Sequence, residues 1–170
     1  INLDAGTDYR LELLAQSSTY LDTDDALTAG RLALTFDRLT PGRYTTGEAI
    51  DVEHRPIPTV RRGKSIVWFT FAALCQGPRS QNDYIAIAKR FQTVVVSDVP
   101  ILDASTDDEA RRFIALIDEF YDRRVKLVIS AAAPAASLYI GQRLAFEFER
   151  TVSRLSEMQS TRYLASAHRP

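Results

Sequence analysis

Residues 93–130 decide the fold, and they read TVVVSDVPILDASTDDEARRFIALIDEFYDRRVKLVIS. The stretch begins with a β-branched apolar run at residues 93–97 and closes with another at residues 125–130, each short enough to be a buried strand. Between them, apolar residues recur at helical spacing over residues 110–121. A strand, a helix and a strand within about forty residues predict a right-handed crossover and a parallel strand pair in an α/β sheet.

Boundary signals indicate three helices in this half of the chain. The run TDDE at residues 106–109 predicts a capping box for the crossover helix, and the arginines at residues 123–124 close it at the end that favours positive charge. Ser80 followed by Asp83 predicts a capping box for a helix that precedes the first strand. After a loop at residues 131–136, a third amphipathic helix is indicated by Phe148, Val152, Leu155 and Met158.

The first third of the chain gives weaker signals. Residues 1–4 predict a strand that begins abruptly, and residues 8–20 fit both a strand and a helix, so their assignment stays open. Thr23 can cap a helix that ends before the PG pair at residues 41–42. The apolar face of that helix consists of Ala29, Leu32, Ala33, Phe36 and Leu39. These features predict a small helical unit.

Three short runs then indicate an antiparallel element. Residues 49–54 alternate apolar and polar side chains, and residues 65–71 are rich in β-branched and aromatic side chains, with residues 57–60 between them. The predicted fold is therefore α/β, with a parallel strand pair, a crossover helix and flanking helices. A small helical and antiparallel region precedes them.

Composition restricts the class of protein. The 170 residues are 45% apolar and 25% charged, which is typical of a soluble globular protein. The net charge of -1 and the scattered arginines argue against nucleic acid as a partner. The single cysteine, Cys75, cannot form an intramolecular disulfide and is expected to be buried. No apolar run approaches the roughly 20 residues that span a bilayer, and the abrupt start without methionine leads us to expect a chain cut from a longer one.

Two segments contain part of a phosphate-binding loop. GRYTTG at residues 42–47 has the glycine spacing, but Glu48 and Ala49 stand where lysine and serine or threonine contact phosphate and magnesium. GKS at residues 63–65 has the final triplet, but Pro58 replaces the first glycine and a strand follows in place of a helix. We expect an ordinary turn at each segment.

Acidic and polar candidates for a nucleotide site are also incomplete. Asp118 and Glu119 form an acidic pair, but they lie in mid-helix, where a solvated face is the expected role. Asp98 directly follows a buried strand, yet residues 99–100 are Val and Pro in place of a second acid, which favours a structural acid. Ser130 ends the next strand, where a hydroxyl is expected to bond to loop backbone rather than to sense a phosphate.

The remaining reactive side chains do not form a catalytic or metal-binding set. His54 is expected in a strand and His168 in a C-terminal tail. Neither histidine has the spacing to Cys75 that a metal site or a catalytic triad requires. No catalytic residue and no metal ligand is predicted. Arg79, in the GPR run at residues 77–79, opens a helix, where its guanidinium can reach a nucleotide or pair with a neighbouring carboxylate.

A family resemblance rests on longer motifs spread over the whole chain. They are NLD at 2–4 with DYR at 8–10, GPRSQNDYI at 77–85, SDVP at 97–100, ARRFIALIDEFYD at 110–122, VKLVIS at 125–130, FEFER at 146–150, SRL at 153–155 and EMQS at 157–160. Together they resemble the C-terminal half of the ZapE cell-division ATPases and their mitochondrial relatives. The resemblance is strongest over residues 77–160.

The resemblance implies an AAA+-like P-loop ATPase that hydrolyses ATP with Mg²⁺ as an intact protein. The family's phosphate loop, Walker B acids, sensor asparagine and arginine finger precede the position of Ile1, so no catalytic residue carries over. The chain alone is therefore expected to be inactive and to hold no cofactor. Arg79 and Arg10 match family motifs and are the nucleotide-proximal candidates. Residues 1–45 are then the end of the ATPase core with a small helical region, and residues 46–170 an α/β C-terminal domain.

The resemblance also implies protein partners. These are the remainder of the ATPase chain and, in bacteria, an FtsZ-type division protein, with a cytoplasmic location at the division site and a homo-oligomer as further expectations. Mitochondrial members are implied to assist turnover of inner-membrane proteins. The alternative function is a non-catalytic protein-interaction module, because the 170 residues contain no complete catalytic constellation.

Overall fold

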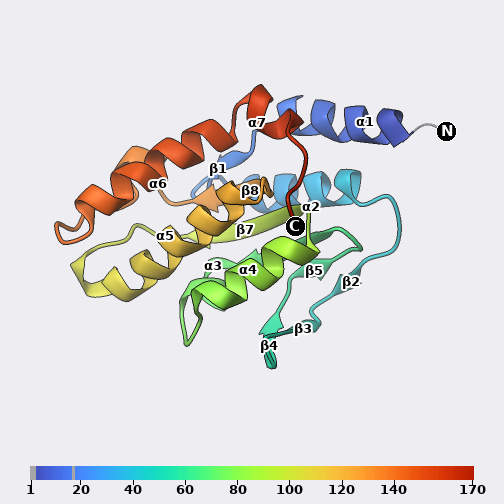
Figure 1. Cartoon of the computed structure of the whole chain (residues 1–170). Coiled ribbons are helices and arrows are strands. Elements are labelled where there is room, and N and C mark those ends of the chain that lie inside the picture. Colours follow the sequence, from blue (N-terminus) through green and yellow to red (C-terminus); the bar gives the residue numbers. More distant parts are fainter. Residues whose placement is uncertain (1–2, 17) are drawn as a thin grey trace.

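A six-stranded sheet forms the centre of the molecule (Figure 1). The computed structural model describes residues 3–16 and 18–170, with side chains from residue 9 onward. Four strands are parallel and lie in the order β1 (Tyr20–Asp22), β8 (Lys126–Ala131), β7 (Thr93–Val99) and β6 (Ile66–Thr70). Beyond β6, the sheet continues with the antiparallel strands β5 (Arg61–Arg62) and β2 (Thr45–Thr46).

Helices cover both faces of this sheet. One face carries α3 (Phe71–Cys75), α4 (Gln81–Arg90), α5 (Asp107–Asp122) and α6 (Ala145–Met158), and the other carries α1 (Leu3–Gln16) and α2 (Thr28–Leu39). The short helix α7 (Thr161–Ala165) contacts α1 and α6. Two 3-10 turns, η1 (Ala104–Thr106) and η2 (Ala135–Ser137), and a separate hairpin of β3 (Ala49–Val52) and β4 (Arg55–Pro58) complete the chain.

Alternating strand side chains build one core on each face of the sheet. In β7, Val94 and Val96 join the core beneath α3 to α6, whereas Val95 joins the core beneath α1 and α2. Side chains of a strand point alternately to opposite faces, and a parallel sheet is usually covered on both, so such strands are apolar throughout. The predicted parallel pair is confirmed as β7 and β8, with α5 as its crossover helix.

The three helices predicted in this half of the chain are confirmed as α4, α5 and α6. Asp83 accepts a hydrogen bond from the Ser80 amide (2.8 Å) in the capping box of α4. The helix after the alanine-rich loop is α6, which buries Phe148 and other apolar residues of the predicted stripe. Thr106 is the N-cap residue of α5, as predicted, but the capping box there is wrong. The Thr106 hydroxyl accepts from the amide of Asp103 (2.9 Å), in the capping box of the preceding turn η1, and makes no cap hydrogen bond to α5.

The N-terminal predictions need correction. The strand expected at residues 1–4 is wrong where the structure describes it, because Leu3 already begins α1, and residues 1 and 2 lie outside the described residues. The open stretch at residues 8–20 divides between α1 and the start of β1. Thr23 does not cap α2, which begins further along the chain. The Thr23 amide donates to the carbonyl of Ala131 (2.9 Å) and continues the pairing of β1 with β8.

The predicted antiparallel element is confirmed only in part. β3 and β4 form an antiparallel hairpin. Residues 65–71 instead place β6 within the main sheet, where it pairs in parallel with β7 and antiparallel with β5. Residues 1–45 supply β1 and α2 to the same sheet and core to which residues 46–170 contribute.

Candidate functional site

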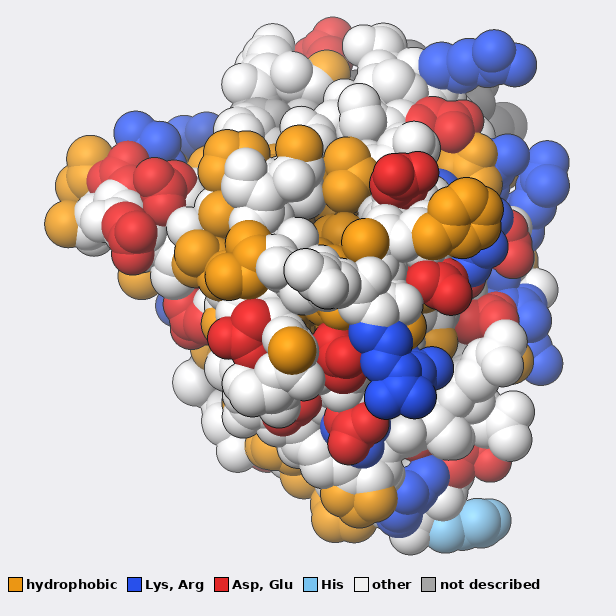
Figure 2. All heavy atoms as spheres, turned by 90° about the vertical axis from the view of Figure 1, so that its left-hand side faces the viewer, with side chains coloured by type: hydrophobic (Ala, Val, Ile, Leu, Met, Phe, Trp, Pro, Cys, Tyr) orange, Lys and Arg blue, Asp and Glu red, His pale blue; other side chains and the backbone are white. Residues whose placement is uncertain are grey.

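The carboxyl ends of the four parallel strands meet at one edge of the sheet, called here the carboxyl edge. Open α/β sheets bind their ligands at this edge. It is built from residues 23–27 after β1, residues 100–106 after β7, residues 132–144 after β8, and α3 with residues 76–80 after β6. Figure 2 shows the molecule from this side.

The connection between β1 and α2 has the strand, loop and helix order of a phosphate-binding element but the wrong chemistry. It carries Asp22, Asp24 and Asp25, and no glycine or lysine. The Asp22 carboxylate accepts from the Asp24 amide and the Asp25 carboxylate from the Leu27 amide, both at 2.9 Å. Loop amides that could hold a phosphate are thus occupied by the loop's own acids, which would also repel it. These residues do not fit a nucleotide phosphate.

At the end of β7, the backbone is held in an unusual conformation. Asp98 has a φ of 63°, in the left-handed region that Asp tolerates better than most residues, and the β7–β8 register shifts between Val96 and Val99. The Asp98 amide donates to the Ser130 hydroxyl at 2.8 Å. Ser130 is buried, and its hydroxyl bonds to backbone as predicted, but to the backbone of strand β7 instead of a loop. Among the described residues no cluster of three or more potential metal ligands exists.

Asp118 and Glu119 lie in α5, away from the strand ends. Asp118 forms ion pairs with Arg150 (3.0 Å) and with Arg154, both in α6. Glu119 accepts a hydrogen bond from the side chain of Gln81 at 2.6 Å. The expected solvated face is therefore wrong in detail, because the Asp118 side chain is only 24% exposed and binds two guanidinium groups of the neighbouring helix.

The two nucleotide-proximal candidates lie at opposite edges of the sheet. Arg79 follows β6 and α3 at the carboxyl edge, where its Nε donates to the carbonyl of Ala73 at 3.0 Å. Arg10 donates to the side chain of Gln92 at 3.3 Å, and Gln92 directly precedes β7. Since β6 and β7 are parallel, the end of one and the start of the other are on opposite sides. The structure does not bring the two arginines together.

Residues 63–65 form an ordinary turn, as expected, whereas residues 42–47 contain strand β2 and are not simply a turn. Residues 63–65 connect β5 to β6, with the Gly63 amide donating to the Ile66 carbonyl at 2.8 Å. Residues 42–47 lead from α2 into β2 and precede no helix. Neither segment offers a helix N-terminus for a phosphate.

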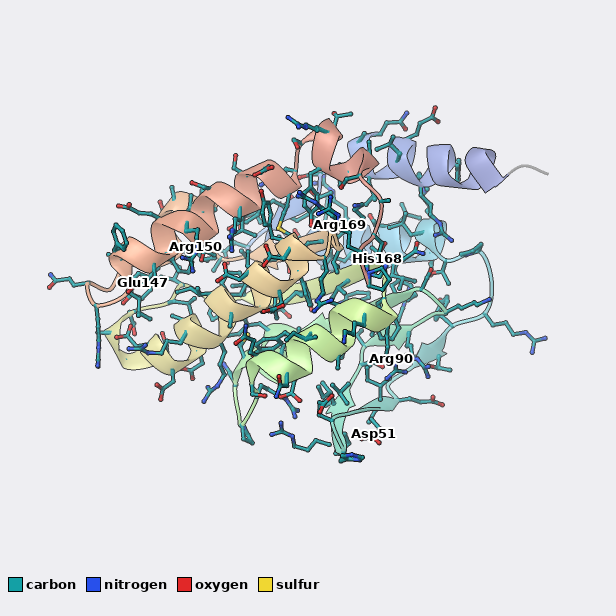
Figure 3. All side chains as sticks on the ribbon, viewed as in Figure 1. Asp51, Arg90, Glu147, Arg150, His168 and Arg169 are labelled. Carbon is teal, nitrogen blue, oxygen red and sulfur yellow. The ribbon has the colours of Figure 1, made fainter. Side chains whose placement is uncertain are left out.

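The cysteine and the histidines have structural surroundings. Cys75 is buried, as expected, and burial raises the pKa of its thiol to about 12. His54 lies in the turn of the β3–β4 hairpin with a φ of 63°, and not in a strand as predicted. The Nε2 atom of His168 lies 2.6 Å from the carbonyl oxygen of Ala88, and the Arg169 amide donates to the carbonyl of Arg123 at 2.8 Å. The last residues therefore lie against α4 and the end of α5 (Figure 3).

The acids of residues 22–25 were not among the candidate site residues predicted from the sequence. Their signal, three aspartates between a strand and a helix, becomes readable only once β1 is known to pair with β8. Across the described residues, no helix is both long and apolar enough to cross a membrane.

Comparison with known proteins supplies the family. A model of the AFG1-like ATPase family matches residues 1–167. The chain is 43% identical over 168 residues to cell division protein ZapE of Escherichia coli K12, covering 99% of this chain and 45% of that protein. It is 30% identical over 207 residues to lactation elevated protein 1 homolog B of Danio rerio, covering 99% of this chain and 41% of that protein.

The match is therefore nearly complete for this chain but not for its relatives. The chain spans less than half the length of these two curated proteins. No solved structure matches it significantly. With the family model covering residues 1–167 and the same relationship supported by ZapE, the chain belongs to the AFG1-like ATPase family.

Proposed function

We propose that this chain is the C-terminal α/β region of a ZapE-like P-loop ATPase, which as an intact protein hydrolyses ATP with Mg²⁺. One observation carries the proposal: the family match covers almost the whole chain, yet the chain contains no complete phosphate-binding loop. ATP hydrolysis needs a loop that holds the phosphates and acids that hold magnesium. Those groups would come from another part of the longer family proteins, and this chain would act as the unit beside them.

Within this proposal, Arg79 approaches the nucleotide. Its Nε donates to the carbonyl of Ala73, its two terminal nitrogens make no hydrogen bond among the described residues, and it lies at the carboxyl edge. Arginine is always charged and presents a planar fork that matches phosphate oxygens. Arg10 lies at the other edge and would reach a nucleotide only on a neighbouring subunit of an oligomer.

Calorimetry with Mg²⁺ and ATP tests the division of labour. We expect binding by the intact protein and none by residues 1–170 alone. Binding by these residues alone would contradict the proposal, because it would require a phosphate site among residues that carry acids in its place.

Substitution of Arg79 tests its role in the intact protein. If Arg79 stabilises charge on the transferring phosphoryl group, Arg79→Ala lowers kcat by at least about tenfold, and Arg79→Lys restores only part of it, because a single ammonium lacks the fork. Arg38→Ala is the matched control, since Arg38 is an exposed arginine near the end of α2 at the opposite edge. Equal ATPase rates for the two alanine variants, with equal melting temperatures, would remove Arg79 from the nucleotide site.

A role in cell division is a second proposal, supported by the printed name of the Escherichia coli relative. Its partner would be an FtsZ-type protein, and its location the cytoplasmic division site. Co-sedimentation of the intact protein with FtsZ polymers, and a fluorescent fusion imaged in dividing cells, test these points. Absence of both co-sedimentation and mid-cell fluorescence would argue against this role while leaving ATP hydrolysis untouched.

A further inference from the structure

Exposed apolar side chains gather at the carboxyl edge. Among the described residues, large apolar side chains are most exposed at seven positions; three of them lie on connections that follow parallel strands, and a fourth lies in the first turn of α6, directly after the connection from β8. These four are Leu27 (63% exposed), Ile101 (44%), Ile140 (64%) and Phe146 (83%). Figure 2 shows hydrophobic side chains grouped across this side. Single exposed apolar residues are common, but a group of them at one edge marks an interaction surface.

The backbone beneath this group is fixed in place. The connections after β7 and β8 pair with each other beyond the sheet, because the Leu102 amide donates to the Leu138 carbonyl (2.7 Å) and the Ile140 amide to the Leu102 carbonyl (2.8 Å). Leu102 and Leu138 are both fully buried. Ile101 and Ile140 therefore extend from a buried anchor, and the surface exists before any partner binds. A preformed surface costs less conformational entropy on binding.

A second anchor connects this pairing to α5 and α6. The Tyr139 hydroxyl donates to a carboxylate oxygen of Asp107 at 2.7 Å, and it accepts from the Leu144 amide at 3.1 Å. Leu144 precedes α6, whose first turn carries the exposed Phe146. Ile101, Ile140 and Phe146 are thus carried by segments whose backbones are tied to each other and to α5.

The charge around the apolar group is negative. Residues 22–27, 71–80, 98–106 and 132–144 contain five aspartates, at positions 22, 24, 25, 98 and 103, and two arginines, Arg79 and Arg143. Four of the aspartates are exposed, and among the described residues Asp25 alone of the five forms an ion pair, with Arg31 at 3.8 Å. The surface therefore fits a protein that presents apolar side chains within a rim of lysine and arginine.

We propose that the carboxyl edge is the docking surface for the nucleotide-binding part of the same ATPase. This inference rests on the proposed function. We assign the nucleotide-binding part to this surface because the curated relatives matched over 99% of this chain are more than twice its length. The family therefore possesses a further part that must be joined to this unit. The edge that serves other α/β proteins as a ligand crevice is here closed to phosphate by its aspartates and serves a protein interface. Because Arg79 lies at the same edge, docking there also points it towards the nucleotide-binding part.

Carbene footprinting of the intact protein, read by mass spectrometry, tests the interface. Leu34, on α2, is 50% exposed and lies outside the carboxyl edge, so it serves as the internal reference. We expect Leu27, Ile140 and Phe146 to be labelled at least about threefold less than Leu34, although each is more exposed than Leu34 in this structure. Labelling equal to or above that of Leu34 would overturn the proposal.

Two further measurements, a dilution series and a charge-reversal variant, identify what covers the surface. Protection that persists on dilution supports docking within one molecule, whereas protection that is lost on dilution would assign the surface to a second copy and overturn the proposal. In the intact protein, Asp24→Lys with Asp25→Lys should raise labelling of Leu27 at least about twofold, since it reverses the charge that a basic partner requires. Unchanged labelling in that variant would overturn the charge argument. Footprinting does not depend on catalytic turnover. An intact wild-type protein without ATPase activity would therefore refute the proposed function and leave the footprinting result on docking unchanged.

Discussion

The layer of α4, α5 and α6 and the carboxyl edge both contain many acids, but they use them differently. In the helical layer, the carboxylates meet guanidinium groups: Asp83 binds Arg55, and Asp118 binds Arg150 and Arg154. At the carboxyl edge, acids such as Asp24 lie exposed or bond to the amides of their own loop. Acids in the layer therefore stabilise the fold, whereas acids at the edge leave their charge available to a partner.

The largest effect should come from the most buried of these carboxylates. Asp83 has no exposed side chain and accepts from the Ser80 amide (2.8 Å) and from Arg55 (3.0 Å). Asp83→Ala leaves the Arg55 guanidinium and the first turn of α4 without this acceptor, so we expect a loss of about 3 kcal/mol in the free energy of unfolding. Urea unfolding followed by circular dichroism measures it. A loss below about 1 kcal/mol would mean that water replaces the carboxylate and that the layer does not depend on this pair.

Asp118 tests the same idea where solvent enters. Because its side chain is 24% exposed, each of its two ion pairs is partly screened, and Asp118→Ala should cost about 1–2 kcal/mol. A double-mutant cycle with Arg154→Ala isolates the coupling between the two helices. Added salt should reduce that coupling. A coupling of zero would show that α5 and α6 associate through their apolar faces alone.

The same two regions differ in how far sequence could predict them. The parallel pair β7 and β8 with α5 followed from local apolar patterns, because each strand is a continuous apolar run and each helix has a clear stripe. The place of β6 did not follow, since its neighbours in the sheet are fixed by pairing and not by its own composition. β1 is only three residues long, too short for a pattern to be recognised.

The candidate site depended on these long-range pairings. The backbone contact of Ser130 could be predicted because Ser130 lies near the end of a clear strand, whereas Asp98 lies within β7 and not after it, with only its amide bonded to Ser130. The acids of residues 22–25 could not, because nothing local shows that β1 joins the sheet beside β8. The separation of Arg79 from Arg10 also became visible only from the parallel register of β6 and β7.

Lys126 extends the comparison to a cation held without an acid. Its Nζ donates to the carbonyl of Arg124 at 2.8 Å, and burial, with the nearby Arg124 charge, lowers the pKa of its ammonium to about 8. The unfolded chain keeps the ordinary value, so between pH 8 and 10.5 the unfolded state binds the extra proton and stability rises with pH. We therefore expect Lys126→Met to stabilise the chain by about 1 kcal/mol at pH 7 and to lose that advantage above pH 9. Thermal unfolding of both proteins across this range checks it, and a pH-independent difference would show that methionine acts by packing alone.

The smallest effect on stability should come from the carboxyl edge. Asp24 is exposed and its side chain accepts no hydrogen bond from the described residues, so Asp24→Ala should change the free energy of unfolding by less than about 0.5 kcal/mol. Asp25→Ala is the matched comparison, because it removes the acceptor of the Leu27 amide and should cost more. Urea unfolding of the two variants side by side measures this difference. A large loss for Asp24→Ala would place its carboxylate among the groups that hold the fold together, and the distinction between paired acids in the helical layer and available acids at the edge would fail.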